Sequence, residues 1–135
     1  MKEIVIYTDG GARGNPGPAG AGAVIYRDGE EVAYVSEFLG RQTNNWAEYE
    51  ALRLALVAAA PFAKGHTVCV FMDSELIVQQ MNGKYRVKDA ELKKQYARVR
   101  ELIEVSYPDI SFEHVRREAN ARADELANNA MDRSA

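Results

Sequence analysis

The sequence predicts an α/β fold: a five-stranded mixed sheet with helices on both of its faces. Short β-branched and apolar runs, typical of strands, alternate with longer segments that repeat apolar residues at helical spacing. Read along the chain, these segments follow the order βββαβααβα. The first three strands are joined by turns and form an antiparallel meander, whereas helices separate the later strands, so the sheet is mixed.

The first third of the chain predicts three strands. Residues 3–8 (EIVIYT) form a buried strand that ends at Asp9. Residues 10–22 hold six of the ten glycines and two of the four prolines, so we interpret them as a turn region leading into a strand at 21–26. Asp28-Gly29 is a hairpin signal, and residues 32–39 return as the third strand.

The rest of the chain alternates helices with two more strands. A helical pattern begins at residue 45 and is expected to end at residue 60, before Pro61. The run 66–72 (HTVCVFM) is apolar on both faces and predicts an interior strand. The remaining elements are a short helix at 74–81 closed by Asn82-Gly83, a charged amphipathic helix at 90–105, a strand at 110–114 and a helix at 119–132.

Composition narrows the classes of protein that fit. A chain of 135 residues that is 47% hydrophobic suits a single domain, residues 1–135. A charged fraction of 27% and a net charge of −3 exclude a disordered acidic tail and a broadly basic nucleic-acid coat. Cys69 is the only cysteine, which excludes an internal disulfide and a thiolate zinc site, and we expect it to be a small buried hydrophobe.

No apolar stretch approaches the roughly 20 residues of a membrane span, and no signal-peptide core follows Met1. We therefore expect a cytoplasmic, monomeric protein without membrane contact.

Four acidic residues lie where a solvated surface explains them poorly. Asp9 and Asp73 each end an apolar strand, at the edge where α/β sheets bind ligands. An Asp-Gly turn would also account for Asp9, and a helix N-cap for Asp73, although Ser74 could equally be that cap. Asp124 lies near the start of the last helix and flanks its apolar face, where the helix dipole by itself favours an acid.

Glu48 is distinguished by its helical phase. At about 100° per residue, it shares a face with Leu52, Ala55 and Leu56, whereas Glu50 lies opposite, alongside Arg53. An unpaired carboxylate facing the core would cost several kcal/mol. The local alternative is a capping box formed by Asn45 and Glu48.

Taken together, the four acids indicate a metal site. If they converged without a cation they would repel one another strongly. Carboxylates without histidine or cysteine partners are ligands suited to Mg²⁺ or Mn²⁺. Two such ions form the usual apparatus for phosphodiester hydrolysis.

Four motifs in this order resemble type 1 ribonuclease H over essentially the whole chain. They are Tyr7-Thr8-Asp9-Gly10-Gly11 with Gly14-Asn15-Pro16-Gly17, Thr43-Asn44-Asn45-Trp46-Ala47-Glu48, Asp73-Ser74, and Asn120-x-x-Ala123-Asp124-x-Leu126-Ala127. The resemblance implies a ribonuclease H-like fold, with Asp9, Glu48, Asp73 and Asp124 as catalytic carboxylates that bind two Mg²⁺ ions. It also implies an endonuclease that cuts the RNA strand of RNA–DNA hybrids and leaves 5′-phosphate and 3′-hydroxyl ends.

The resemblance also implies contacts to both strands of the hybrid, through 2′-hydroxyls on one and deoxyribose on the other. The loop residues Gly10, Gly11, Arg13 and Asn15 match positions that meet the RNA strand. Asn44 and Asn45 match residues that read the minor groove, and Thr43 matches a DNA-phosphate contact. Lys88 belongs to a basic stretch, residues 84–100, with seven positive and two acidic residues, which could contact phosphates. A solvated helix face is the alternative, and we favour it for Arg98 and Arg100.

Three departures from the family pattern affect rate and substrate choice. Residues 115–120 (VRREAN) lack the loop histidine of many bacterial members; Arg117 and Glu118 are the candidates to replace it, and His114 is expected to be structural. The long basic protrusion is absent. Asp89 stands where many members have an asparagine beside the DNA phosphate.

These departures match a shorter subgroup, some members of which also cut double-stranded RNA. One alternative is therefore a broader nuclease. A second is a non-catalytic hybrid-binding module, which we favour less, because a module that only binds would gain from losing negative charge near phosphates and this chain retains four acids. A fragment of a larger protein is also disfavoured, since the run of elements is complete.

Overall fold

The computed structural model describes residues 2–133 and contains one five-stranded sheet. The strands are β1 (Glu3–Ala12), β2 (Gly17–Arg27), β3 (Glu30–Gln42), β4 (Thr67–Met72) and β5 (Ile110–His114). Their spatial order is β3-β2-β1-β4-β5. The pairs β1–β2 and β2–β3 are antiparallel, and β1–β4 and β4–β5 are parallel, which confirms the mixed sheet.

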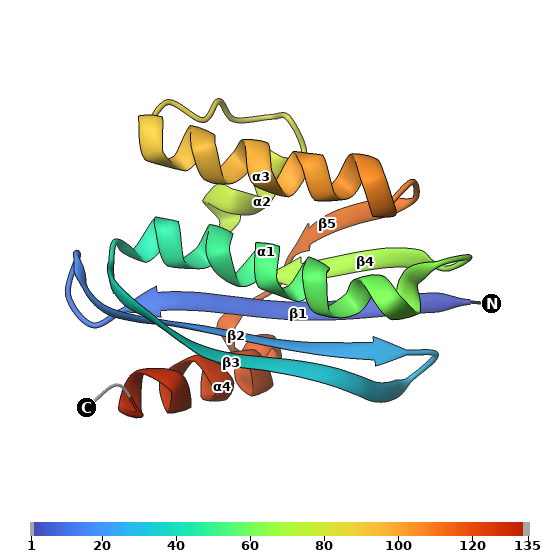
Figure 1. Cartoon of the computed structure of the whole chain (residues 1–135), viewed down its shortest axis with the longest axis horizontal. Helices are drawn as coiled ribbons and strands as arrows, with labels where there is room; N and C mark the ends of the chain where they lie inside the picture. Colours follow the sequence, from blue (N-terminus) through green and yellow to red (C-terminus); the bar gives the residue numbers. More distant parts are fainter. Residues whose placement is uncertain (1, 134–135) are drawn as a thin grey trace.

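Helices cover both faces of the sheet (Figure 1). The helices are α1 (Asn44–Ala63), α2 (Glu75–Met81), α3 (Ala90–Ser106) and α4 (Ala121–Asp132), the last preceded by a 3₁₀ turn, η1 (Arg117–Asn120). Helix α1 packs on β1 and β2, and α3 packs on α1, whereas α4 lies alone on the opposite face. Within residues 2–133, none of these helices combines the length and apolarity needed to span a membrane.

The main core lies between the sheet and α1 with α3. It is built from alternate residues of β1 and β4, such as Ile4, Ile6 and Val70, which face Leu52 and Leu56 of α1. Burying side chains of this size stabilises the fold by about 1.5–3 kcal/mol each. This core fixes α1 against β1, and so fixes the end of the sheet where the acidic residues lie.

The glycine-rich segment is mostly strand, so our interpretation of residues 10–22 as a turn region is wrong. Strand β1 continues to Ala12 and β2 starts at Gly17. Gly20 and Gly22 face α4 so closely that a Cβ at Gly22 would lie 2.2 Å from the Ala123 carbonyl oxygen. Glycine weakens a strand signal because it has no side chain to pack, and here that lack of a side chain admits a helix.

Two further expectations need correction. Helix α1 does not end before Pro61 but continues to Ala63. A proline in the last turn removes only one hydrogen bond, and the carbonyl left free belongs to exposed Val57, where water can satisfy it. Cys69 is half-buried, with its Sγ 3.3 Å from Glu113 Oε2, because α4 does not extend over β4.

The other turn predictions are confirmed. Asp28 and Gly29 connect β2 to β3 with φ angles of 49° and 89°, the left-handed pair of a tight hairpin. Gly83 closes α2 with φ 76°. Strand β4 is interior, between β1 and β5.

Candidate active site

The four predicted carboxylates converge at one end of the sheet. Single oxygens of Asp9, Glu48 and Asp73 all lie within 4.8 Å of one another. The Asp124 carboxyl shares a side-chain hydrogen bond with that of Asp9. Residues from β1, α1, α4 and the segment after β4 therefore form one acidic cluster.

Sheet register brings the two strand-end acids together. In the parallel β1–β4 ladder the last pair is Thr8 with Met72, so Asp9 and Asp73, one residue further along the chain in each case, lie side by side. Asp73 directly follows β4, but Asp9 lies inside β1, so our expectation that the first strand ends at Asp9 is wrong: β1 continues to Ala12, paired with β2. Both acids still lie where the parallel pairing stops, at the edge where α/β sheets place ligands. Asp9 is also opposite Gly22 of β2, the glycine that admits the start of α4 and with it Asp124.

The local alternatives for Glu48 and Asp73 fail. The N-cap of α1 is Thr43, whose hydroxyl accepts a hydrogen bond from the Trp46 amide, so Glu48 lies beyond the capping box. The N-cap of α2 is Ser74, which accepts from the Ile77 amide and leaves the Asp73 carboxylate uncommitted. Neither acid is explained by helix capping.

Bringing these acids together in a buried place raises the pKa values of two of them. Burial, followed by repulsion from Asp73 and the interactions with Asp124 and Glu48, raises the pKa of Asp9 from 3.8 to about 8. Burial raises the pKa of Glu48 from 4.5 to about 7, against the opposing effects of a Ser74 hydrogen bond and of Arg117. Among the residues that the structure describes, Asp73 Oδ2 is a buried oxygen without a hydrogen-bond partner. Clustered acids, two of them with raised pKa values, and a buried oxygen without a hydrogen bond are the features expected of a divalent-cation site.

Gly10 is required by packing rather than by substrate. A Cβ at this position would lie 2.2 Å from the Ala47 carbonyl oxygen, so its absence lets α1 approach β1 and brings Glu48 to the cluster. Gly11 is different, since a Cβ there would meet only Asn44 Oδ1, at 3.5 Å. The expected close approach of backbone to a duplex can therefore apply to Gly11.

The residues expected to contact substrate do not all lie beside the acids. Asn44 Oδ1 accepts from the Ala12 amide, and the Asn44 amide donates to Asn15 Oδ1, which ties the β1–β2 turn to the start of α1 beside the acids. Arg13 instead points to α4, with an ion pair of 2.7 Å to Asp132. Thr43 and Lys88 are exposed, and Asn45 is partly exposed.

Asp89 is the N-cap of α3 and accepts from the Leu92 amide at 3.0 Å. Arg98 and Arg100 are engaged within the protein. Arg98 donates to Gln95, and Arg100 donates to Tyr96 and to the Met81 carbonyl oxygen. Our preference for a solvated helix face is therefore wrong for Arg100, which is half-buried, whereas Arg98 is exposed. The other cations of the basic stretch, Lys84, Arg86, Lys88, Lys93 and Lys94, are exposed.

A hollow of about 370 Å³ opens beside the acids and is lined by Glu48, Asp73, His114, Val115, Arg116, Arg117 and Glu118. Arg117 is the cation near the cluster, with Nε 3.9 Å from Asp73 Oδ2 and a side chain that is 82% exposed. Our expectation that His114 is structural is wrong, because its side chain is exposed on this hollow. Strand β5 is the edge of the sheet, and His114 is its last residue.

Glu50 lies alongside Arg53, on the side of α1 away from the acidic cluster, as helical phase predicts. It is buried, with 7% exposure against 9% for Glu48, because α3 covers the side of α1 that faces away from the sheet. Its two carboxylate oxygens accept from Arg53 at 2.8 and 2.7 Å, and Oε1 also accepts from Gln95 at 3.2 Å. These donors lower the pKa of Glu50 despite its burial, so it is a structural ion pair apart from the acidic cluster.

Asn120 is a site residue whose role the sequence did not reveal. It is 1% exposed, and its Nδ2 donates to the Thr8 carbonyl oxygen at 2.8 Å, next to Asp9. This bond joins the start of α4 to β1. Its place in the same motif as Asp124 was the available signal, but spacing cannot show which strand an amide will reach.

Comparison with known proteins gives consistent matches. Residues 7–130 match the family described as "Reverse transcriptase-like". The structure of LC11-RNase H1, isolated from compost, aligns with a TM-score of 0.94 and 49% identity over 99% of both chains, and a second structure of LC11-RNase H1 aligns with a TM-score of 0.93.

Among curated proteins, ribonuclease HI of Halobacterium salinarum is 45% identical over 93% of this chain and 63% of its own length. The "Bifunctional protein Rv2228c" of Mycobacterium tuberculosis is 42% identical over 98% of this chain. The chain thus spans 36% of the mycobacterial relative.

Proposed function

The chain belongs to the ribonuclease H family, and on that basis we propose that it is an endoribonuclease that hydrolyses the RNA strand of RNA–DNA hybrids. The observation that carries the proposal is the convergence of Asp9, Glu48, Asp73 and Asp124 around one point. The relative LC11-RNase H1, at 49% identity, has been crystallised in complex with an RNA/DNA hybrid, which supports the choice of substrate.

The chemistry of the donor set fits divalent metal ions. Four carboxylates without a cysteine or histidine among them suit Mg²⁺, with Mn²⁺ as a substitute. Asp73 Oδ2, a buried oxygen without a hydrogen-bond partner in the described chain, is the kind of atom that a cation would satisfy. Two bound ions would supply activation of the attacking water and stabilisation of the leaving oxygen, giving 5′-phosphate and 3′-hydroxyl ends.

The chain's own residues perform four tasks in this proposal. Asp9, Glu48, Asp73 and Asp124 hold the cations, and the raised pKa values of Asp9 and Glu48 make cation binding pH-dependent. The β1–β2 turn and the start of α1, which hydrogen bonds of Asn15 and Asn44 hold together, position the RNA strand. Gly11, Asn15 and Asn44 contact it, and Asn45 and Gly10 lie beside them. Thr43 and Lys88 meet DNA phosphates. Arg117, the exposed cation by the acids, neutralises phosphate charge at the reacting end, with Glu118 next to it.

Arg13 was also expected to contact the RNA strand, and it keeps that role only if its ion pair with Asp132 opens. The pair is exposed, so it contributes at most about 1 kcal/mol and can exchange for a phosphate.

A duplex-cleavage assay tests the proposal. The full chain is incubated with 5′-labelled RNA–DNA, RNA–RNA and DNA–DNA duplexes of one sequence, in Mg²⁺, in Mn²⁺ and in chelator. We expect cleavage of the RNA–DNA duplex in either metal and none in chelator. Cleavage of RNA–RNA as well would support the broader nuclease, and binding of the hybrid without cleavage would support the non-catalytic module.

A further inference from the structure

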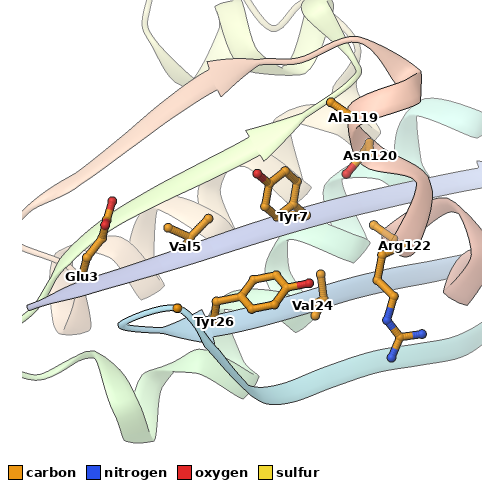
Figure 2. Close-up of a pocket in the computed structure, with 10 residues that line it drawn as sticks. Glu3, Val5, Tyr7, Val24, Tyr26, Ala119, Asn120 and Arg122 are labelled. Atoms are coloured by element: carbon orange, nitrogen blue, oxygen red, sulfur yellow. The ribbon is translucent and has the colours of Figure 1, made fainter.

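A groove on the α4 face of the sheet lies outside the acidic cluster. It has a volume of about 440 Å³ and is lined by Glu3, Val5, Tyr7, Val24, Tyr26, Gly29, Ala119, Asn120, Arg122 and Ala123 (Figure 2). A volume of this size is typical of small-molecule sites. We refer to these ten residues as the aromatic groove.

The groove exists because α4 is too short for the strand it covers. Helix α4 has 12 residues, about 18 Å, whereas the ten residues of β1 extend about 33 Å. The helix packs at Gly20 and Gly22, which pair with Gly11 and Asp9, so it covers the Asp9 half of β1. The half from Glu3 to Tyr7 is left open.

Flat aromatic surfaces form the walls. The Tyr7 and Tyr26 rings meet edge to face, with centroids 6.2 Å apart. Phe71 stacks on Tyr7 from β4, with centroids 5.1 Å apart, and holds that ring in place. Val5 and Val24 lie beside the tyrosines on the same sheet face (Figure 2). Planar rings bind by stacking on such surfaces.

One buried polar atom at the end of the groove has no partner. Asn120 is 1% exposed and donates from Nδ2 to the Thr8 carbonyl oxygen. Its Oδ1 accepts no hydrogen bond from any group in the described residues, and Figure 2 shows that oxygen turned towards the Tyr7 side. A buried carbonyl oxygen left unpaired costs about 1–3 kcal/mol, so the site favours a ligand that donates an N–H or O–H there.

The surrounding charge disfavours anions. Glu3 lies at the opposite end of the groove from Asn120 (Figure 2). Arg122 is paired with Glu31 and Glu125 at 3.4 and 3.3 Å, which leaves three carboxylates to one guanidinium in this set. A phosphate would be repelled, so the groove is unsuited to a nucleic-acid backbone.

We propose that the aromatic groove is a second binding site, for an uncharged planar heteroaromatic molecule that carries an N–H donor, such as a nucleoside without phosphate. The ring stacks on Tyr26 and meets the perpendicular Tyr7 ring edge to face, and its N–H donates to Asn120 Oδ1. Since Asn120 also donates to Thr8, the ligand lies one hydrogen-bonded step from the strand that carries Asp9.

The test is a titration of the ¹⁵N-labelled full chain with adenosine, followed by amide chemical shifts in metal-free buffer. We expect saturable binding by about 5 mM, with the largest shifts at residues of the aromatic groove. Adenosine monophosphate, which has the same ring with a phosphate, should bind about threefold more weakly or worse.

Tyr26→Leu keeps an apolar side chain but removes the ring, and should weaken adenosine binding about fivefold or more. Tyr34→Leu is the matched control, because Tyr34 is a 61% exposed tyrosine on β3 that does not line the groove, and it should bind adenosine normally.

Three outcomes would overturn the proposal. They are no saturable shifts in the wild-type chain, largest shifts around the four carboxylates, or equal or tighter binding of the monophosphate. The first two need no variant, so they do not depend on whether Tyr26→Leu folds. None of them bears on hybrid cleavage.

Discussion

The repulsion within the acidic cluster leads to a prediction about stability. Asp9→Asn should stabilise the metal-free protein at alkaline pH while it abolishes cleavage. The folded-state pKa of Asp9 is raised from 3.8 to about 8, so the folded protein holds a proton that the unfolded chain has released. Stability from this group is therefore complete below about pH 4 and is lost as pH rises through about 8.

The magnitude follows from the same values. A rise from 3.8 to about 8, at about 1.4 kcal/mol per pH unit, sets an upper limit of about 6 kcal/mol. Side-chain rotation lets the four carboxylates separate, so we expect Asp9→Asn to gain about 2–3 kcal/mol at pH 9. For a chain of this length that corresponds to about 5–10 °C in Tm.

The assay is urea and thermal unfolding of both proteins in chelator at pH 4, 7 and 9. The gain of Asp9→Asn should grow with pH and be close to zero at pH 4. Asp109→Asn is the control, because Asp109 is exposed and distant in sequence from the acidic residues, and it should change stability by less than about 0.5 kcal/mol at every pH.

Added Mg²⁺ gives an independent measurement. A cation that binds only the folded state should raise the wild-type Tm and raise that of Asp9→Asn much less, which reverses their order. If Asp9→Asn were no more stable than wild type at pH 9 in chelator, the acids would not repel in the way described, and the case for a cation site would lose its electrostatic basis.

Three further predictions concern neighbouring residues. Glu48→Gln should lower the cleavage rate at least about a hundredfold and leave stability unchanged or higher. Glu50→Gln should retain cleavage but lower the free energy of unfolding by about 1.5–3 kcal/mol, since it weakens the hydrogen bonds from Arg53. Cleavage kinetics and unfolding measured on both variants separate the two effects. Gly10→Ala should cost several kcal/mol or prevent folding, because its Cβ would meet the Ala47 carbonyl oxygen, whereas Gly11→Ala should fold normally and raise KM for the hybrid; circular dichroism and cleavage kinetics would show this. Asp89→Asn keeps an N-cap acceptor for α3 while removing a negative charge, so stability should change by less than about 0.5 kcal/mol and KM for the hybrid should fall.

Each of these comparisons has an outcome that would contradict it. Equal loss of cleavage in the two glutamate variants would mean that Glu50 belongs to the acidic cluster. A stable, well-folded Gly10→Ala would mean that α1 and β1 can separate without loss. An unchanged KM for Asp89→Asn would mean that no DNA phosphate approaches this cap.

Much of the fold was available from the sequence. Short apolar runs and helical periodicity identified all five strands and four helices in the right order, and the ends of β5 and α2 were placed within a residue. Such local patterns report one face of one element, which is why they succeed for β1 and β4. They failed at Gly17–Gly22, where glycines in the strand leave space for α4, a helix more than 100 residues later in the chain. A pattern of neighbouring residues does not report so distant a contact.

The candidate site divides in the same way. Strand ends and motif order singled out Asp9, Glu48, Asp73 and Asp124 from twenty acidic residues, because chain position shows where a carboxylate is out of place. Only the tertiary structure could decide their surroundings. The parallel register set Asp9 beside Asp73, Ser74 became the N-cap of α2, and α3 buried Glu50 on the side of α1 away from the acidic cluster. Helical phase describes a single cylinder, whereas burial depends on every element that packs around it.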